Sequence, residues 1–194
     1  GCTAGLSPQP SLSATSPATS TAPAVPPPST GPFNQELHDE LVAMLERDQS
    51  SRTGGPVTES DQARTDRLEQ IIYEFGWPTV SLVGEDGEDA AWAMAQHSDL
   101  DREFQRFALE QLRAAVDIDQ ASPGNLAYLE DRVATGAGEP QTYGTQVRCG
   151  PDGPVPATPI NDETGLEQRR ADAGLDPFAD YLAEMAVICA EIPE

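Results

Sequence analysis

The spacing of apolar residues predicts that most of the chain beyond residue 33 is helical. The first amphipathic stripe repeats at i, i+4, i+7 and i+8, at Leu37, Leu41, Met44 and Leu45. It predicts a helix from about 34 to 51. A second helix is expected over 61–75, because Ser60 is a good N-cap and Gly76 suits the position just past the end.

The same reasoning predicts five more helices. They cover about 87–97, 100–118, 123–134, 164–173 and 177–190, and the fourth of these could instead open at Asp162. Residues 80–83 are expected to form a short apolar stretch between helices. Glycine and proline around Gly150 to Gly153 predict a small hairpin within 136–160. The expected fold is therefore mainly α, a single domain of six or seven helices with one β-hairpin.

The first 32 residues differ sharply from the rest in composition. Proline, serine, threonine and alanine dominate, and the stretch 3–32 carries no charge. Such a sequence cannot bury enough surface to offset its ordering entropy, so a disordered linker is expected before a folded domain at 33–194. Gly1-Cys2 resembles the end of a bacterial lipobox, so we expect a lipid on Cys2; the alternative is an incidental cysteine.

Charge and hydropathy exclude several classes of protein. The formal net charge is −22, from 33 acidic residues against 11 arginines and no lysine. This argues against nucleic-acid binding, which requires clustered cations. Nothing approaches the ~18 apolar residues of a membrane span, so membrane contact is expected through the lipid on Cys2 only. We expect an extracytoplasmic monomer, with no cofactor and no metal.

The two remaining cysteines lie in the folded part. In an exported protein Cys149 and Cys189 are expected to pair, a link worth roughly 4 kcal/mol on a chain-entropy estimate. The alternative is two free thiols, one of them buried in the last helix.

Several polar residues occupy positions that a plain helical bundle would give to apolar ones. Asp48 extends the apolar stripe of the first helix, and Arg52 at i+4 could compensate its charge. His97 lies on an inward stripe, with Asp99 two residues later to orient its ring. These residues fit a general base with its carboxylate. They also fit a salt bridge and a helix-capping histidine of purely structural role.

Further candidates lie in the second half. Read as a strand, 141–146 puts hydrogen-bonding side chains on both faces, which suits a polar cleft or an exposed hairpin. Arginine is scarce, so Arg132 and the Arg169-Arg170 pair could hold an anionic group, or balance nearby acids. The expected ligand-binding set is Arg52, Gln96, Arg132, Gln141, Tyr143, Gln146, Arg169 and Arg170.

A series of short motifs resembles one bacterial family. In order they are Asp48-Gln49-x-x-Arg52, Gly76-Trp77-Pro78, Gln96-His97-x-Asp99, Leu129-Glu130-Asp131-Arg132-Val133, Gln141-x-Tyr143-Gly144-Thr145-Gln146 and Arg169-Arg170-Ala171. The chain resembles domain-of-unknown-function family 6624 over about 36–183. The resemblance implies one domain whose polar residues belong together, and it transfers no activity.

Three functions follow as hypotheses. The first is a lipoprotein domain whose polar cleft binds a small polar or peptide-like ligand. The second is a hydrolase that uses His97 as general base with Asp99 or Asp48, and Arg132 or Arg169 against negative charge. The third is a protein-interaction module whose acidic surface meets a basic partner.

Overall fold

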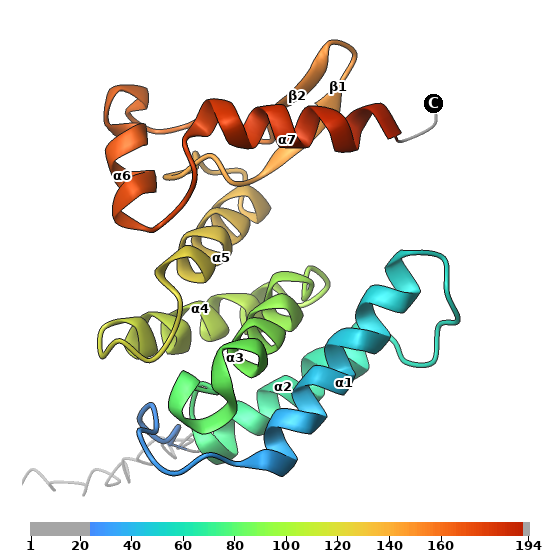
Figure 1. Cartoon of the computed structure of the whole chain (residues 1–194), viewed down its shortest axis with the longest axis vertical. Helices are drawn as coiled ribbons and strands as arrows, with labels where there is room; N and C mark the ends of the chain where they lie inside the picture. The colour runs from blue at the N-terminus through green and yellow to red at the C-terminus, as the bar shows by residue number, and fades with distance from the viewer. Residues whose placement is uncertain (1–23, 192–194) are drawn as a thin grey trace, which may run out of the picture.

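The structure is a computed structural model that describes residues 24–191, and these form a mainly helical domain (Figure 1). The expected fold class is confirmed, with seven α-helices and one antiparallel hairpin in the described range. The elements are α1 (Gln35–Arg52), α2 (Asp61–Phe75), α3 (Val80–Gln96), α4 (Arg102–Val116), α5 (Pro123–Gly136), β1 (Val147–Gly150), β2 (Gly153–Pro156), the 3₁₀ turn η1 (Glu163–Gly165), α6 (Leu166–Asp172) and α7 (Phe178–Glu191).

The hydrophobic core is formed by the first five helices. Helix α3 is central and packs against α1, α2, α4 and α5. The apolar stripes identified in the sequence face this core, and the largest apolar side chains that are fully buried are Leu41, Met44, Leu68, Ile71, Ile72, Trp77, Leu112 and Leu129. Helix α3 packs against several helices at once because its small alanine side chains at 90, 91, 93 and 95 let the neighbouring helices approach closely.

Helix α3 begins earlier than expected. Residues 80–83, expected to lie between helices, form its first turn, with the Thr79 hydroxyl accepting from the Leu82 N–H at 3.3 Å. Gly84 then interrupts the helix at φ 76°, a left-handed conformation that favours glycine. The apolar residues 80–83 therefore form one buried helical turn before a kink. A run of four apolar residues does not show from sequence alone whether it is such a turn or an extended segment.

Helix α4 begins two residues later than expected, at Arg102. Asp101 provides the N-cap, since its side chain accepts from the Phe104 N–H at 2.9 Å. Leu100 lies outside the helix and is 78% exposed. The following helix α5 opens as predicted, with Ser122 as N-cap and Pro123 in the first turn.

Residues 24–32 lie against the folded domain. The Thr79 hydroxyl donates to the Ser29 carbonyl at 2.5 Å, and Val25 packs on the hydrophobic core. This part of the predicted linker therefore packs against helices. Cys2 and its predicted lipid lie outside the described residues.

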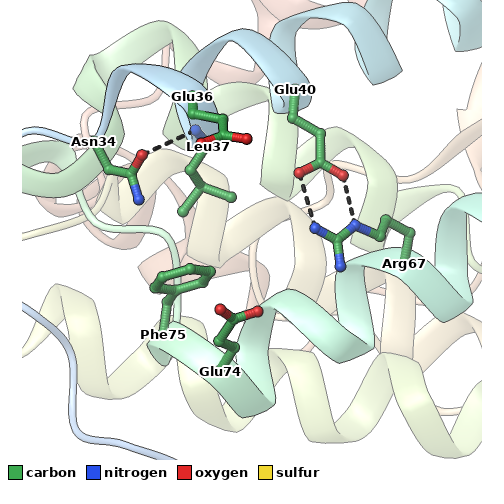
Figure 2. A pocket seen from close by; sticks show the side chains of 7 residues that line it. All are labelled: Asn34, Glu36, Leu37, Glu40, Arg67, Glu74 and Phe75. Atoms are coloured by element: carbon green, nitrogen blue, oxygen red, sulfur yellow. Dashed lines mark hydrogen bonds and ion pairs between the residues drawn. The ribbon is translucent and has the colours of Figure 1, made fainter.

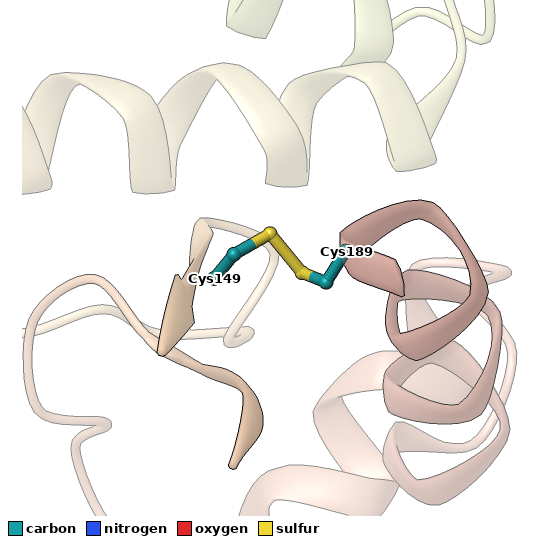
Figure 3. Close-up of a disulfide and its surroundings, with 2 residues drawn as sticks. All are labelled: Cys149 and Cys189. Atoms are coloured by element: carbon teal, nitrogen blue, oxygen red, sulfur yellow. A yellow bond between two sulfur atoms is a disulfide. The ribbon is translucent and has the colours of Figure 1, made fainter. Parts of the chain in front are cut away.

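The hairpin and α7 are joined covalently. Strands β1 and β2 pair in antiparallel register from Val147 with Pro156 to Gly150 with Gly153. The disulfide from Cys149 in β1 to Cys189 in α7 confirms the predicted pairing, with a Cα–Cα distance of 5.5 Å (Figure 3). Disulfides persist in oxidising compartments, which fits an exported protein. Within 24–191, no helix is both long and apolar enough to cross a membrane.

The disulfide generates the first prediction. Replacing both cysteines, Cys149→Ser with Cys189→Ser, should lower the free energy of unfolding by about 4 kcal/mol, because the unfolded chain regains the entropy of a long loop. The two cysteines are separated by 40 positions in the sequence. Urea unfolding followed by circular dichroism measures the change. Dithiothreitol should destabilise the parent chain and leave the double variant unaffected; equal stability of parent and variant would contradict the expectation.

Candidate ligand-binding cleft

A cleft of about 300 Å³ opens where α3, α5, the start of β1 and α7 meet. It gathers four of the polar residues singled out in the sequence. They are Gln96, His97, Arg132 and Gln146. The other lining residues are Trp92, Tyr128, Thr145, Val147, Tyr181 and Met185. Two sides of different character result, one aromatic and one polar.

Three aromatic rings form one side of the cleft. Trp92 and Tyr128 meet edge to face at 5.8 Å between ring centroids, and Tyr128 meets Tyr181 edge to face at 6.3 Å. The Tyr181 hydroxyl donates to the Thr145 carbonyl at 2.6 Å, which anchors α7 to the chain before β1. Burial raises the pKa of both tyrosines, so both hydroxyls stay protonated. The rings, each nearly perpendicular to the next, offer an uncharged and largely apolar surface to a ligand.

His97 is oriented by Asp48. Its Nδ1 lies 2.8 Å from Asp48 Oδ2, and Arg52 Nε lies 3.1 Å from the same nitrogen. A proton on Nδ1 satisfies the carboxylate, whereas a proton on Nε2 would leave two acceptors facing each other at 2.8 Å. The Arg52 Nε–H also points at Nδ1, but the two Asp48 oxygens accept it at 3.0 and 3.1 Å, so we assign the ring proton to Nδ1, and Nε2 keeps its lone pair with no partner among the described residues.

The surroundings of His97 favour its neutral form. Burial lowers the pKa of His97 below its usual 6.5 and outweighs the opposing charge of Asp48; the Arg52 guanidinium also lowers it. The side chain keeps 26% of its surface exposed, on the cleft. A neutral imidazole with a free Nε2 at an open cleft has the protonation state of a general base.

Asp48 is fully buried, and its charge is compensated by two further helix residues. Arg52, predicted as its i+4 partner, contacts the carboxylate through Nε at 3.0 and 3.1 Å. Arg64 of α2 approaches the same carboxylate at 3.4 Å and also bonds Asp61. The sequence indicated Arg52 but not Arg64, because only tertiary packing brings α2 to this position.

Asp99 does not contact His97. Its carboxylate instead pairs with Arg132, whose Nε donates to Oδ1 at 3.0 Å and whose second nitrogen bonds Oδ2. Burial alone would raise the pKa of Asp99, but the Arg132 guanidinium lowers it below the usual range. Arg132 Nη1 also donates to Gln146 Oε1 at 3.0 Å. Asp99 therefore positions Arg132 at the cleft, and Asp48 takes the role of orienting His97.

The strand expected over 141–146 does not form. The buried carboxylate of Asp131 instead accepts from the backbone N–H groups of Thr142, Tyr143 and Thr145, at 2.8 to 3.2 Å, and from the Thr145 hydroxyl. These donors would have paired with a neighbouring strand, and Asp131 takes the place of that strand. Gly144, at φ 68°, allows the chain to curl around the carboxylate.

Five of the eight predicted ligand-binding residues do not line the cleft. Arg52 contacts Asp48 and His97 instead, and the other four are held in or against the chain around 142–145. Gln141 is fully buried and exchanges hydrogen bonds with the Gln146 backbone through its side-chain amide. Arg169 donates to the Thr142 carbonyl and Arg170 to the Tyr143 carbonyl. Tyr143 does not line the cleft either. These residues brace the 142–145 segment, and any ligand contact by them stays a prediction.

Two cleft residues carry buried polar atoms with no hydrogen-bond partner among the described residues. They are Trp92 Nε1, a donor, and Gln96 Oε1, an acceptor. A buried polar atom without a partner destabilises a fold by ~1–3 kcal/mol. Sequence reasoning missed Trp92, Tyr128 and Tyr181 as site residues, because aromatic residues at helical spacing usually indicate core.

The structure contains other hollows. One lies between the start of α1 and the end of α2, where Glu40 and Arg67 pair through both carboxylate oxygens and Phe75 forms a side (Figure 2). Another is bordered by Glu88, which burial holds at a pKa of about 7 although Trp77 and Asn125 donate to it. Within 24–191, no cluster of three or more histidine, cysteine or acidic side chains could hold a metal ion.

A family model matches residues 35–187, and it describes a family of unknown function, DUF6624. The chain belongs to this family. The resemblance carried by the short motifs is thereby confirmed, over nearly all of the folded part of this DUF6624 protein. No curated protein and no solved structure matches the chain. The function of this DUF6624 domain must therefore be argued from the cleft itself.

The second prediction concerns its two histidines. The imidazole of His97 should titrate below pH 6.5, because burial disfavours its charged form. The imidazole of His38 should titrate above pH 6.5, because Asp86 and Asp39 accept hydrogen bonds from its ring. Imidazole ¹H–¹⁵N correlation spectra recorded across a pH series measure both titration midpoints. At neutral pH the shifts of His97 should also show the tautomer with the proton on Nδ1.

His38→Gln assigns the two sets of signals without touching the cleft. A His97 midpoint above 6.5, or a neutral form protonated on Nε2, would contradict the geometry at Asp48.

Proposed function

We propose that this DUF6624 domain is an extracytoplasmic binding domain, tethered by a lipid on Cys2, whose cleft holds a small polar or peptide-like ligand. The observation that carries the proposal is the convergence of Gln96, His97, Arg132 and Gln146 on one open cleft beside three aromatic rings. Small-molecule sites combine apolar surface with a few oriented polar groups in this way. The disulfide supports an oxidising compartment.

The polar groups in the cleft are held before any ligand arrives. Asp48 fixes His97, and Asp99 fixes Arg132, which in turn holds the Gln146 amide. A site whose side chains are already ordered loses less entropy on binding. Arg132 already has a carboxylate partner in Asp99, which Arg102 also contacts at 3.2 Å, so a ligand need not supply a negative charge for it.

A second candidate function has one specific observation in its favour, the His97–Asp48 pair with Nε2 free at the cleft. Such a pair activates a nucleophile by accepting its proton. No serine or cysteine lines the cleft in the described chain, and the Thr145 hydroxyl donates to Asp131. The reaction would therefore be hydrolysis by a water molecule, which Nε2 deprotonates as it attacks.

The interaction-module hypothesis has less support. Exposed large apolar side chains are spread over the described surface, at Phe33, Val57, Leu100, Ile118, Val187 and Ile188. Docking surfaces for proteins usually form a contiguous apolar patch.

Binding is tested with a set of small polar compounds that includes amides, sugars and amino acids. The protein has two tryptophans, and the indole N–H signal of Trp92 should shift on binding while that of Trp77, bonded to Glu88, should not. Met185→Arg should weaken any binding at least tenfold, since its long side chain would fill the cleft.

Val187→Arg is the matched control, because Val187 lies on the same helix and is 61% exposed. The cleft is not the binding site if no compound shifts either indole signal, or if compounds bind equally well to Met185→Arg and Val187→Arg.

Hydrolysis is tested on p-nitrophenyl acetate and on peptide amides. If the second function holds, His97→Gln should lower the rate by roughly 100-fold or more, and the rate should fall with protonation of His97 below pH 6.5. His38→Gln should leave it unchanged. Equal rates in the parent chain and in His97→Gln would leave binding as the function.

A further inference from the structure

We propose that the ligand of this cleft is an extended peptide segment, and that Trp92 and Gln96 recognise the backbone N–H and C=O of one of its residues. The inference rests on the proposed binding function and names the ligand class for the same site. It starts from the two unpartnered atoms, Trp92 Nε1 and Gln96 Oε1.

These two atoms belong to neighbouring side chains. Residues 92 and 96 are four positions apart on α3, so they lie on one face of the helix, the face that borders the cleft. Gln96 is 8% exposed, so its amide is almost entirely withdrawn from water. One buried donor and one buried acceptor therefore lie on the face of α3 that borders the cleft, both without a partner in the described part of the protein, and a ligand reaches them when the two side chains turn toward the cleft.

Other buried amide side chains in the described chain are satisfied. Gln105 donates to the carbonyls of Ala95 and Gln96 at 3.1 and 3.2 Å. Gln141 bonds the Gln146 backbone in both directions, and Asn125 donates to Glu88. Three buried side-chain polar atoms of the described residues lack partners, and two of the three belong to side chains that line this cleft. The third is the Thr158 hydroxyl, which is outside the lining of the cleft.

The chemistry of the pair identifies the ligand. In an extended chain, the N–H and C=O of one residue point to the same side and bond a facing residue together. Such a residue offers the acceptor that Trp92 requires and the donor that Gln96 requires. The aromatic rings of Tyr128 and Tyr181 then face its side chains and α-carbons, and no ligand charge is needed because Asp99 already neutralises Arg132.

The test uses the whole chain and two probes that differ in one atom. One is N-acetyl-L-alanyl-L-alanyl-L-alanine methylamide. The other replaces the backbone N–H of the central alanine by an ester oxygen, which removes one donor. We expect the ester to bind at least tenfold more weakly than the amide, measured by titrating the Trp92 indole signal. This signal should move downfield with the amide, as its proton gains an acceptor.

Gln96→Leu provides the decisive variant. It should melt at or above the temperature of the parent chain, because it removes an unpartnered buried amide, and it should bind the amide probe at least tenfold more weakly. In this variant the amide and ester probes should bind with equal affinity, because the Gln96 oxygen that accepts from the peptide N–H is absent. Gln62→Leu, at an exposed position of α2, is the matched control and should retain the tenfold preference.

Each other outcome overturns the inference in a distinguishable way. Equal affinity of amide and ester for the parent chain rules out recognition of the peptide N–H. Binding of N-acetylglucosamine in place of the peptide overturns the peptide class and keeps the binding function. If neither these probes nor the broader set of polar compounds moves the Trp92 signal, the proposed function fails with it.

Discussion

The buried charge of Asp48 is the constraint on which the first half of the structure depends. A carboxylate with no exposed surface is tolerated only when cations and donors surround it. Arg52 comes from the same helix, Arg64 from α2 and His97 from the end of α3, so one charge joins three helices. The consequence reaches the cleft, because the bond that satisfies Asp48 also fixes the ring and tautomer of His97.

A second buried carboxylate organises the other half in the same way. Asp131 gathers the backbone N–H groups of 142–145, and the carbonyls of this segment in turn receive Arg169, Arg170 and Tyr181. The segment therefore needs no regular secondary structure, since its donors and acceptors are met by side chains. The cleft lies where these two systems meet, with α3 on one side and the Asp131-held segment and α7 on the other.

Local sequence predicted what depends on local interactions. The apolar stripes and the Ser60 cap placed most helices, and Arg52 was found because i+4 pairing needs no tertiary knowledge. Asp48 and His97 stood out because polar residues lay on apolar stripes. The strand prediction for 141–146 was wrong because its backbone donors are satisfied by Asp131, ten or more residues away. The partner of Asp99 was equally out of reach, since Arg132 lies 33 positions along the chain.

The aromatic side of the cleft could not be identified from the sequence. Trp92, Tyr128 and Tyr181 follow ordinary helical spacing, so nothing in their positions distinguishes core from cleft. Trp92 is distinguished by the unmet hydrogen bond at its Nε1, and the two tyrosines by their place in the lining of the cleft, and only the folded arrangement reveals either. A sequence optimised for stability alone would replace Gln96 by an apolar residue. Gln96 stands there instead, at a cost to the unliganded fold, and this is the physical reason to seek a ligand that completes the pair.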